Sequence, residues 1–254
     1  MKILHIIPNL RKGGAERLVI DIVRKLNMDP SLDVKLVLFE NQIDYQVCDL
    51  EPIIEIIPSH VRLSLFKKNE FVINSLQSFI EGFQPAIIHS HLYYAEIVSR
   101  SCYYPQAKWF SHVHDRMQSL NNLNLFNVNT KRELTNYFEK KYLMKRYKKN
   151  GNNHFISISK DVESFLIKVI QKNKRIFLLP NAIDLSRFNR PFSKNEFVQN
   201  TLCKLVSIGR LDKNKNHEFL LDCMVVLKSI NVPVHLTILG EGDQRIFLEK
   251  KNLI

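Results

Sequence analysis

The chain has 254 residues, of which 45% are hydrophobic, enough for one large domain or two small ones with a packed core. No apolar run approaches the roughly 20 residues that cross a bilayer, and the first residues become polar too soon for a signal peptide. The net charge of +12 favours anionic partners: nucleotide diphosphates, anionic lipid head groups or nucleic acid.

The first segments of the chain predict a strand, a glycine turn and a helix. Residues 2–7 form a nearly continuous apolar run, as in a buried parallel strand. Apolar residues then recur with helical spacing over residues 15–26, directly after Gly13 and Gly14. Two glycines at a helix N-terminus let a phosphate approach the backbone, although an ordinary tight turn has the same residues. The segment lacks the GxGxxG pattern, which argues against a dinucleotide cofactor.

The rest of the chain continues to alternate strands with helices. Further strands are expected at residues 34–39, 53–57, 86–91, 109–113, 154–159 and 175–179, then from residue 204 and at 234–239. Helices are expected at residues 71–83, 93–101, 131–149, 160–170, 218–230 and 243–251. Residues 188–202 have little periodicity, so we expect a boundary there between domains at 1–190 and 200–254. This order predicts an α/β fold with parallel sheets.

Polar residues gather at the carboxyl ends of two of the expected strands. One strand ends with His89 and His91, and another carries His112 and is followed by His114 and Asp115. Ligands bind at the carboxyl ends of strands in open parallel sheets, so these residues are placed like site residues. A structural role is nonetheless the usual outcome for any one of the nine histidines.

The middle of the chain contains an asparagine-rich segment and a basic helix. Residues 121–129 interleave Leu and Phe without a clear period, and we expect a loop over the cleft. The last two turns of the helix at 131–149 carry six cations: Lys140, Lys141, Lys145, Arg146, Lys148 and Lys149. Cations are favourable near a helix C-terminus, so a solvated face explains them. The alternative is a patch for an anionic membrane surface, where each cation contributes about 1 kcal/mol.

The strand that begins at residue 204 breaks at Gly209 and leads into a cationic turn. Arg210, Lys213 and Lys215 lie within six residues, just before the helix at 218–230. Cationic side chains and the free N–H groups of a helix N-terminus together suit a phosphate. We hypothesise that Arg210 and Lys215 clamp the diphosphate of a nucleotide-sugar. A solvated basic turn is the alternative.

Four segments together resemble retaining glycosyltransferases of family 4, which have the two-domain GT-B fold. They are GGAER at 13–17, SHVHD at 111–115, ISK at 158–160 with PNAID at 180–184, and GRL at 209–211 with KN at 215–216 and GEG at 240–242. Each motif is weak alone, but their order and spacing are specific and span nearly the whole chain. The resemblance implies a complete N-terminal Rossmann-like domain followed by an incomplete second one.

The resemblance also implies an activity: retaining transfer of a sugar from a nucleotide-diphosphate sugar to a hydroxyl acceptor. Gly13 and Gly14 would approach the donor diphosphate, and Arg210 and Lys215 would stabilise the leaving nucleoside diphosphate. His114 would lie beside the transferred sugar. Prepositioned cations stabilise charge that develops in the transition state, so neither a metal nor a cofactor is expected, and the sequence has no DxD motif.

Further contacts with the donor or acceptor are expected beside these motifs, at Glu16, His91, Asp115, Asn181, Gly240, Glu241 and Gly242. The acceptor is expected to be a surface polysaccharide or a lipid-linked glycan. Two departures from the family stand out. Ala182 replaces the usual glycine of the NGID pattern, and a left-handed backbone there would cost about 1 kcal/mol. Family members also continue past the GEG turn to a pair of glutamates, so we expect this chain to be truncated.

Other interpretations remain open. In one alternative, the chain is one half of a split enzyme, or a remnant. It would then act through a partner chain that supplies the missing sheet. A sugar-nucleotide epimerase of the same fold fits the motifs less well, and nucleic-acid binding lacks any recognition motif. Four spaced cysteines without a CxxC pair predict reduced thiols rather than a zinc or disulfide framework. We therefore expect a cytoplasmic protein, with peripheral contact to the cytoplasmic membrane face through the basic helix.

Overall fold

The computed structural model describes residues 1–64, 68–117, 130–170, 175–185 and 202–252. The chain divides into two compact units, Met1–Phe188 and Asn189–Ile254. The loop expected at 121–129 lies outside the described residues, and so does nearly all of the domain boundary expected at 188–202. The two units are described separately.

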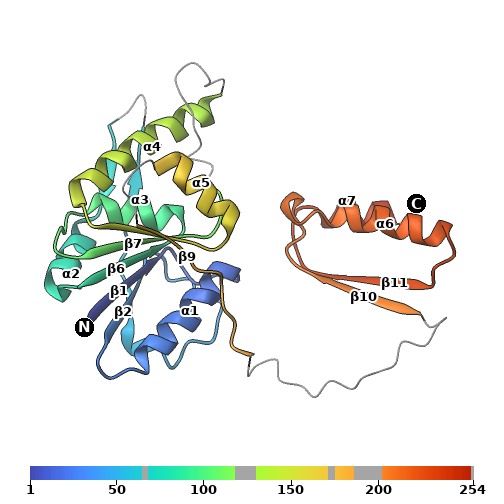
Figure 1. Ribbon diagram of the computed structural model, residues 1–254, viewed down its shortest axis with the longest axis horizontal. Helices are drawn as coiled ribbons and strands as arrows, with labels where there is room; N and C mark the ends of the chain where they lie inside the picture. The colour runs from blue at the N-terminus through green and yellow to red at the C-terminus, as the bar shows by residue number, and fades with distance from the viewer. Residues whose placement is uncertain (65–67, 118–129, 171–174, 186–201, 253–254) are drawn as a thin grey trace. The chain divides into compact units, whose positions relative to one another are not determined.

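The first unit is built on a seven-stranded sheet in which all neighbouring strands are parallel (Figure 1). Its strands are β1 (Lys2–Ile7), β2 (Asp33–Leu38), β3 (Ile54–Ile56), β6 (Ile87–His91), β7 (Lys108–Val113), β8 (Asn153–Ser157) and β9 (Arg175–Leu178). The spatial order is β3-β2-β1-β6-β7-β8-β9. The order therefore reverses between β1 and β6, and such a switch point is where open α/β sheets bind ligands. The expected α/β class is confirmed.

Helices cover both faces of this sheet (Figure 1). They are α1 (Gly14–Asn27), α2 (Asn74–Phe83), α3 (Tyr93–Ser101), α4 (Lys131–Asn150) and α5 (Lys160–Ile170). Alternate residues of β1 point to opposite faces. Ile7 packs with Val19 and Val23 of α1, whereas Leu4 and Ile6 belong to the cluster that α2 and α3 complete. Both faces of the central strands are thus buried, which accounts for their continuous apolar sequence.

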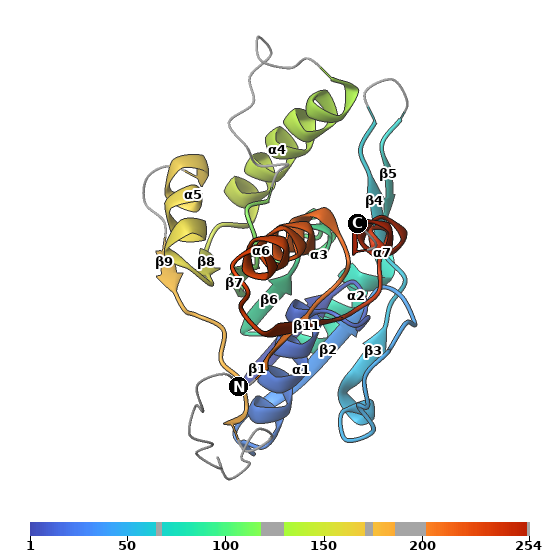
Figure 2. The ribbon, with the colours of Figure 1, turned by 90° about the vertical axis from the view of Figure 1, so that its right-hand side faces the viewer.

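The helix expected at residues 71–83 is shorter than the sequence pattern suggested. It begins at Asn74, and the preceding residues form strand β5 (Glu70–Val72), which pairs antiparallel with β4 (His60–Arg62). Figure 2 shows this hairpin extending beyond the main sheet. A 2.9 Å contact between His60 Nε2 and Glu70 Oε1 joins its strands. Apolar periodicity cannot separate a short strand from the first turn of a helix, which explains the error.

The second unit contains one parallel strand pair and two helices (Figure 1). They are β10 (Cys203–Ile208), α6 (His217–Ser229), β11 (Val234–Leu239) and α7 (Arg245–Asn252). Leu211 and Leu248 are the only buried apolar side chains among its described residues. Large apolar side chains are exposed on β10 and on α6, including Ile208 at 78% and Val225 at 66%. The described part of this unit therefore buries little core of its own.

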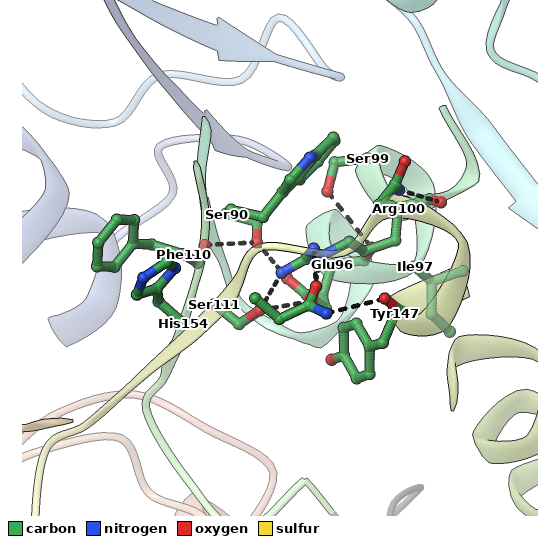
Figure 3. A network of polar contacts seen from close by, with 12 residues as sticks. Ser90, Glu96, Ile97, Ser99, Arg100, Phe110, Ser111, Tyr147 and His154 are labelled. Atoms are coloured by element: carbon green, nitrogen blue, oxygen red, sulfur yellow. Dashed lines mark hydrogen bonds and ion pairs between the residues drawn. The ribbon is translucent and has the colours of Figure 1, made fainter. Parts of the chain in front are cut away.

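A buried polar network joins α3 to three strands of the first unit (Figure 3). Glu96 and Arg100, one helical turn apart on α3, are 1% and 0% exposed, and Arg100 Nε donates to Glu96 Oε1 at 2.8 Å. The Glu96 carboxylate also accepts from Ser90 of β6 and, at 2.6 Å, from Ser111 of β7. Arg100 Nη1 donates to Asn153 of β8 at 2.6 Å. Each charge is therefore both paired and hydrogen-bonded, as buried charges require.

Aromatic rings enclose the guanidinium of Arg100. It lies 4.7 Å from the ring centroid of Trp109 and 4.9 Å from that of Tyr147 on α4. Burial and the nearby Glu96 charge raise the pKa of Tyr147 well above its ordinary value, so the phenol stays neutral. The network thus also fixes α4 against the strands.

We predict that Arg100→Ala strongly destabilises the first unit, because the buried Glu96 carboxylate loses its countercharge. The expected loss in the free energy of unfolding is about 3–5 kcal/mol. Urea unfolding followed by the fluorescence of Trp109, the single tryptophan, measures it. Arg62→Ala is the control, because Arg62 is 78% exposed and 3.8 Å from Glu70, and it should lose less than about 1 kcal/mol. Equal losses in the two variants would contradict the structural role of the network.

Candidate functional site

Five imidazoles lie together towards the carboxyl ends of β1, β6 and β7. They belong to His5, His89, His91, His112 and His114, and each ring centroid lies 4.2–5.8 Å from at least two others. Strand register explains the grouping, because His5 pairs with His89 and His91 pairs with His112. The structure thus brings together two predicted site residues, His91 and His114, whose ring centroids are 5.8 Å apart. Asp115 follows them as an exposed residue.

These imidazoles are neutral at physiological pH. Burial lowers the pKa of His5 and of His114 to about 4, and burial together with the neighbouring histidines lowers that of His112 to about 3. The pKa values of His89 and His91 are lowered well below the ordinary value, again first by burial. At pH 7 each ring therefore offers one N–H donor and one lone pair, rather than a positive charge.

The backbone turns sharply at this edge of the sheet. Leu92, between His91 and α3, has φ 69° and ψ 152°, a backbone conformation that residues other than glycine rarely adopt. Its side chain packs against the core between α1 and the sheet, and this packing offsets the strain. Strained residues of this kind cluster at binding sites, which agrees with the position of His91.

The Gly13–Gly14 turn connects β1 to α1 and is held by Tyr45. The Gly13 N–H donates to Tyr45 Oη at 3.0 Å, and the Tyr45 hydroxyl donates to Gly13 O at 2.8 Å. The Glu16 carboxylate occupies the space that a Cβ at Gly13 would need, whereas the space at Gly14 is open. A diphosphate at this turn would therefore meet Gly14 and the first turn of α1, since the Gly13 N–H already has a partner.

In the second unit, the turn after β10 presents Arg210 and Lys215. Both side chains are exposed, and Arg210 Nη2 lies 3.1 Å from Asp212 Oδ2. Asp212 also caps the turn by accepting from the Lys215 N–H at 3.1 Å. His217 is 4% exposed and fixes the turn from beneath, with Nε2 3.2 Å from Arg210 O and Nδ1 3.4 Å from Ser207 Oγ. The two cations therefore project from a turn that is held rigidly by its neighbours.

The GEG turn packs directly against this cationic turn. A Cβ at Gly240 would lie 1.8 Å from Gly209 O, and one at Gly242 would lie 2.4 Å from Leu211 O. The Leu211 N–H donates to Glu241 O at 2.9 Å. Gly240 and Gly242 are therefore explained by close backbone packing, whereas the exposed Glu241 side chain contacts Arg245 at 2.5 Å.

The PNAID segment follows β9 and lies along α1 (Figure 1). Residues 182–185 and α1 line one groove, and Asn181 is exposed. Ala182 is not among the described non-glycine residues with positive φ. The strain anticipated for an alanine at this position is therefore absent.

Sequence reasoning missed several residues that shape these sites. Tyr45 is separated from Gly13 by 32 positions, and no local pattern indicated the contact. His217 stood directly after the cationic turn, at the start of α6, where the helix was expected to begin one residue later. In the sequence, Ser90 resembles an ordinary strand end, and Glu96 and Arg100 resemble the solvated face of a helix.

Comparison with solved structures identifies the fold. Sucrose-phosphate synthase from Thermosynechococcus elongatus is similar with a TM-score of 0.63 at 14% identity, over 99% of this chain and 68% of that one. An S. aureus TarM mutant in complex with Fondaparinux, alpha-GlcNAc-glycerol and UDP gives 0.58 at 12% identity, over 99% and 75%. The lipopolysaccharide outer core galactosyltransferase WaaB gives 0.55 at 12% identity, over 100% and 71%. These likenesses define a fold of the GT-B type.

Sequence comparison then gives the family. The model of Glycosyltransferase Family 4 matches residues 12–187, and the chain belongs to that family. No curated protein sequence matches the chain significantly. Across the described residues, no helix combines the length and apolar composition of a membrane-spanning segment.

Proposed function

We propose that the protein transfers a sugar, with retention, from a nucleotide-diphosphate sugar to a hydroxyl of a surface polysaccharide or lipid-linked glycan. The observation that carries the proposal is the family match over residues 12–187. The sheet of the first unit also has a switch point in its strand order, between β1 and β6, where ligands of such folds bind.

Arg210 and Lys215 are proposed to stabilise the leaving nucleoside diphosphate. Breaking the bond between sugar and diphosphate builds negative charge on the leaving group, and fixed cations bind that charge most strongly in the transition state. The rigid turn beneath them, held by Asp212 and His217, keeps them in place before the reaction. Arg210 would exchange its 3.1 Å contact with Asp212 for the donor. Because these cations supply the charge, the transfer is proposed to need no metal and no cofactor.

His114 is proposed to bind the transferred sugar as a neutral group. Burial lowers its pKa to about 4, and its Nε2 has no hydrogen-bond partner among the described residues. Such a ring offers a directed hydrogen bond to a sugar hydroxyl. The acceptor hydroxyl would attack from the face that the leaving group quits. Further proposed contacts come from Gly14, together with Gly13, Glu16, His91, Asp115, Asn181, Gly240, Glu241 and Gly242.

We predict that Arg210→Ala and Lys215→Ala each weaken the binding of UDP- or GDP-sugars by about 10- to 100-fold, the effect of losing one charged hydrogen bond. Isothermal titration calorimetry with a panel of nucleotide-sugars measures it. Lys228→Ala is the matched control, because Lys228 is an exposed cation at the other end of α6. Binding that all three variants retain equally would refute the clamp.

A second candidate function is that of one half of a split enzyme. Its support is the exposed apolar surface of the second unit, which includes Val206 at 61%, Ile208 at 78% and Phe219 at 59% exposed. Uncovered apolar surface of this kind marks an interface. The solved structures of the same fold are longer, since this chain covers 68–75% of them. The proposed partner is therefore a chain that supplies the rest of a second Rossmann-like domain.

Coexpression with a separate polypeptide that has the C-terminal half of a GT-B domain tests this candidate. We expect a stable one-to-one complex by gel filtration with light scattering, and donor binding only in that complex. Ile208→Asp should prevent assembly, because a charge would be buried at the interface. Met28→Asp is the control, since Met28 is a 72% exposed apolar residue of the first unit. Full donor binding by the isolated monomer would exclude this candidate.

A third proposal concerns location at the cytoplasmic face of an anionic membrane. Lys141, Lys145 and Lys148 are exposed and spaced along one face of α4, with Phe138 also 43% exposed. Cations that flank exposed aromatic rings suit the head-group region of a bilayer.

We predict that replacing these three lysines by Ala lowers affinity for anionic vesicles about 100-fold, at about 1 kcal/mol per cation. Co-sedimentation with phosphatidylglycerol and with phosphatidylcholine vesicles measures the difference. A variant with Lys2, Lys25 and Lys108 replaced by Ala carries the same charge change elsewhere and should bind normally. Equal binding to both vesicle types by the unmodified protein would reject the proposal.

A further inference from the structure

The histidine cluster contains more unpartnered polar atoms than its role beside the donor explains. Six of its ring nitrogens are buried without a hydrogen-bond partner among the described residues: His5 Nε2, His89 Nε2, His91 Nδ1, His112 Nδ1, His112 Nε2 and His114 Nε2. Four of the six belong to three rings, those of His91, His112 and His114. His91 is 0% and His112 3% exposed. Buried polar atoms are nearly always satisfied, so these three rings call for a ligand.

We propose that His91, His112 and His114 form a binding site for a transition-metal ion of the zinc class. One ligand nitrogen from each ring lies within 4.8 Å of the other two. A tetrahedral zinc ion with bonds of about 2.0–2.1 Å holds its ligand nitrogens about 3.3 Å apart, so the three rings would close around the ion on binding. The donors are all imidazoles, which suit zinc, cobalt, nickel and copper rather than magnesium or calcium.

A hydrogen bond to His5 selects this group over the neighbouring one. His5, His89 and His91 also have ligand nitrogens within 4.8 Å of one another. However, His91 Nε2 lies 3.1 Å from His5 Nδ1. If His91 Nε2–H donates, His91 Nδ1 keeps a lone pair for a metal, while His5 carries its own proton on Nε2 and cannot bind one. The opposite tautomer protonates His91 Nδ1 and removes His91 from both groups.

The hydrogen bond between His5 and His91 also gives the proposed metal site a contact outside the ligand atoms, of the kind that usually surrounds such sites. Metal-binding histidines commonly donate their second ring N–H to a fixed acceptor, which orients the ring. His5 Nδ1 plays this part for His91. Among the three ligands, His114 is the partly exposed one and lies just beyond β7.

Three protein ligands leave one coordination position open. Because His114 is also the residue proposed above to contact the sugar, a bound ion would occupy that contact and inhibit donor binding. This consequence rests on the proposed function, whereas metal binding itself does not. The site would therefore act against the transfer reaction, which is proposed to need no metal.

The test is a titration of the chelator-treated full chain with Co²⁺, followed by its visible d–d absorption, and with Zn²⁺ by calorimetry. We expect one site with tetrahedral cobalt bands and no thiolate charge-transfer band. His112→Gln should weaken binding at least tenfold, and so should His114→Gln, which replaces a partly exposed ring and serves if His112→Gln does not fold. His89→Gln and His235→Gln, the latter an exposed residue of β11, should bind as the unmodified protein does.

Three outcomes would overturn the assignment: no binding at millimolar metal, equal loss in the His235 variant, or loss in the His89 variant while the His112 variant still binds. Competition completes the test. Zn²⁺ should weaken nucleotide-sugar binding in the unmodified protein but not in the His112→Gln variant. If cobalt binds as expected and the protein binds no nucleotide-sugar, the metal site stands and the proposal that this chain alone binds the donor fails.

Discussion

The first unit depends on the ion pair between Glu96 and Arg100. Two full charges lie at 1% and 0% exposure, and their desolvation is offset because β6, β7 and β8 each contribute a hydrogen-bonding group. An apolar core would pack the helix as well but would allow it to slide. Directed bonds from β6, β7 and β8 fix its register along the sheet.

This constraint reaches the candidate site through the alternation of side chains along a strand. Ser90 and Ser111 bond to α3 on one face of the sheet, and the next residues, His91 and His112, point to the other face. Holding the serines therefore holds the histidines. Leu92, with its strained backbone, is the next residue after His91. The polar network, the turn at Leu92 and the imidazole cluster therefore form one connected structure at the switch point between β1 and β6.

Periodicity was sufficient to predict most of the fold. The buried runs of β1 and β2 and the helical stripe of α1 are local patterns, and so is the alternation that implies a parallel sheet. The β4–β5 hairpin was missed because the apolar residues of β5 were included in the helical pattern of α2. The site was predicted less completely, because its geometry is determined by contacts between residues that are far apart in the sequence. Nothing near Gly13 in the sequence indicates Tyr45, and nothing near His91 indicates that His5 Nδ1 bonds to its Nε2.

In the second unit, local contacts define the structure more than a buried core does. Its described part buries few apolar side chains, yet its cationic turn is well defined. Short-range contacts account for this: Asp212 caps the turn, His217 bonds to Arg210 O, and Gly240 permits the backbone of the second turn to touch the first. A cationic turn of this shape needs only two strand ends and a helix start. The exposed apolar faces around it concern the stability and association of the unit rather than the shape of the turn.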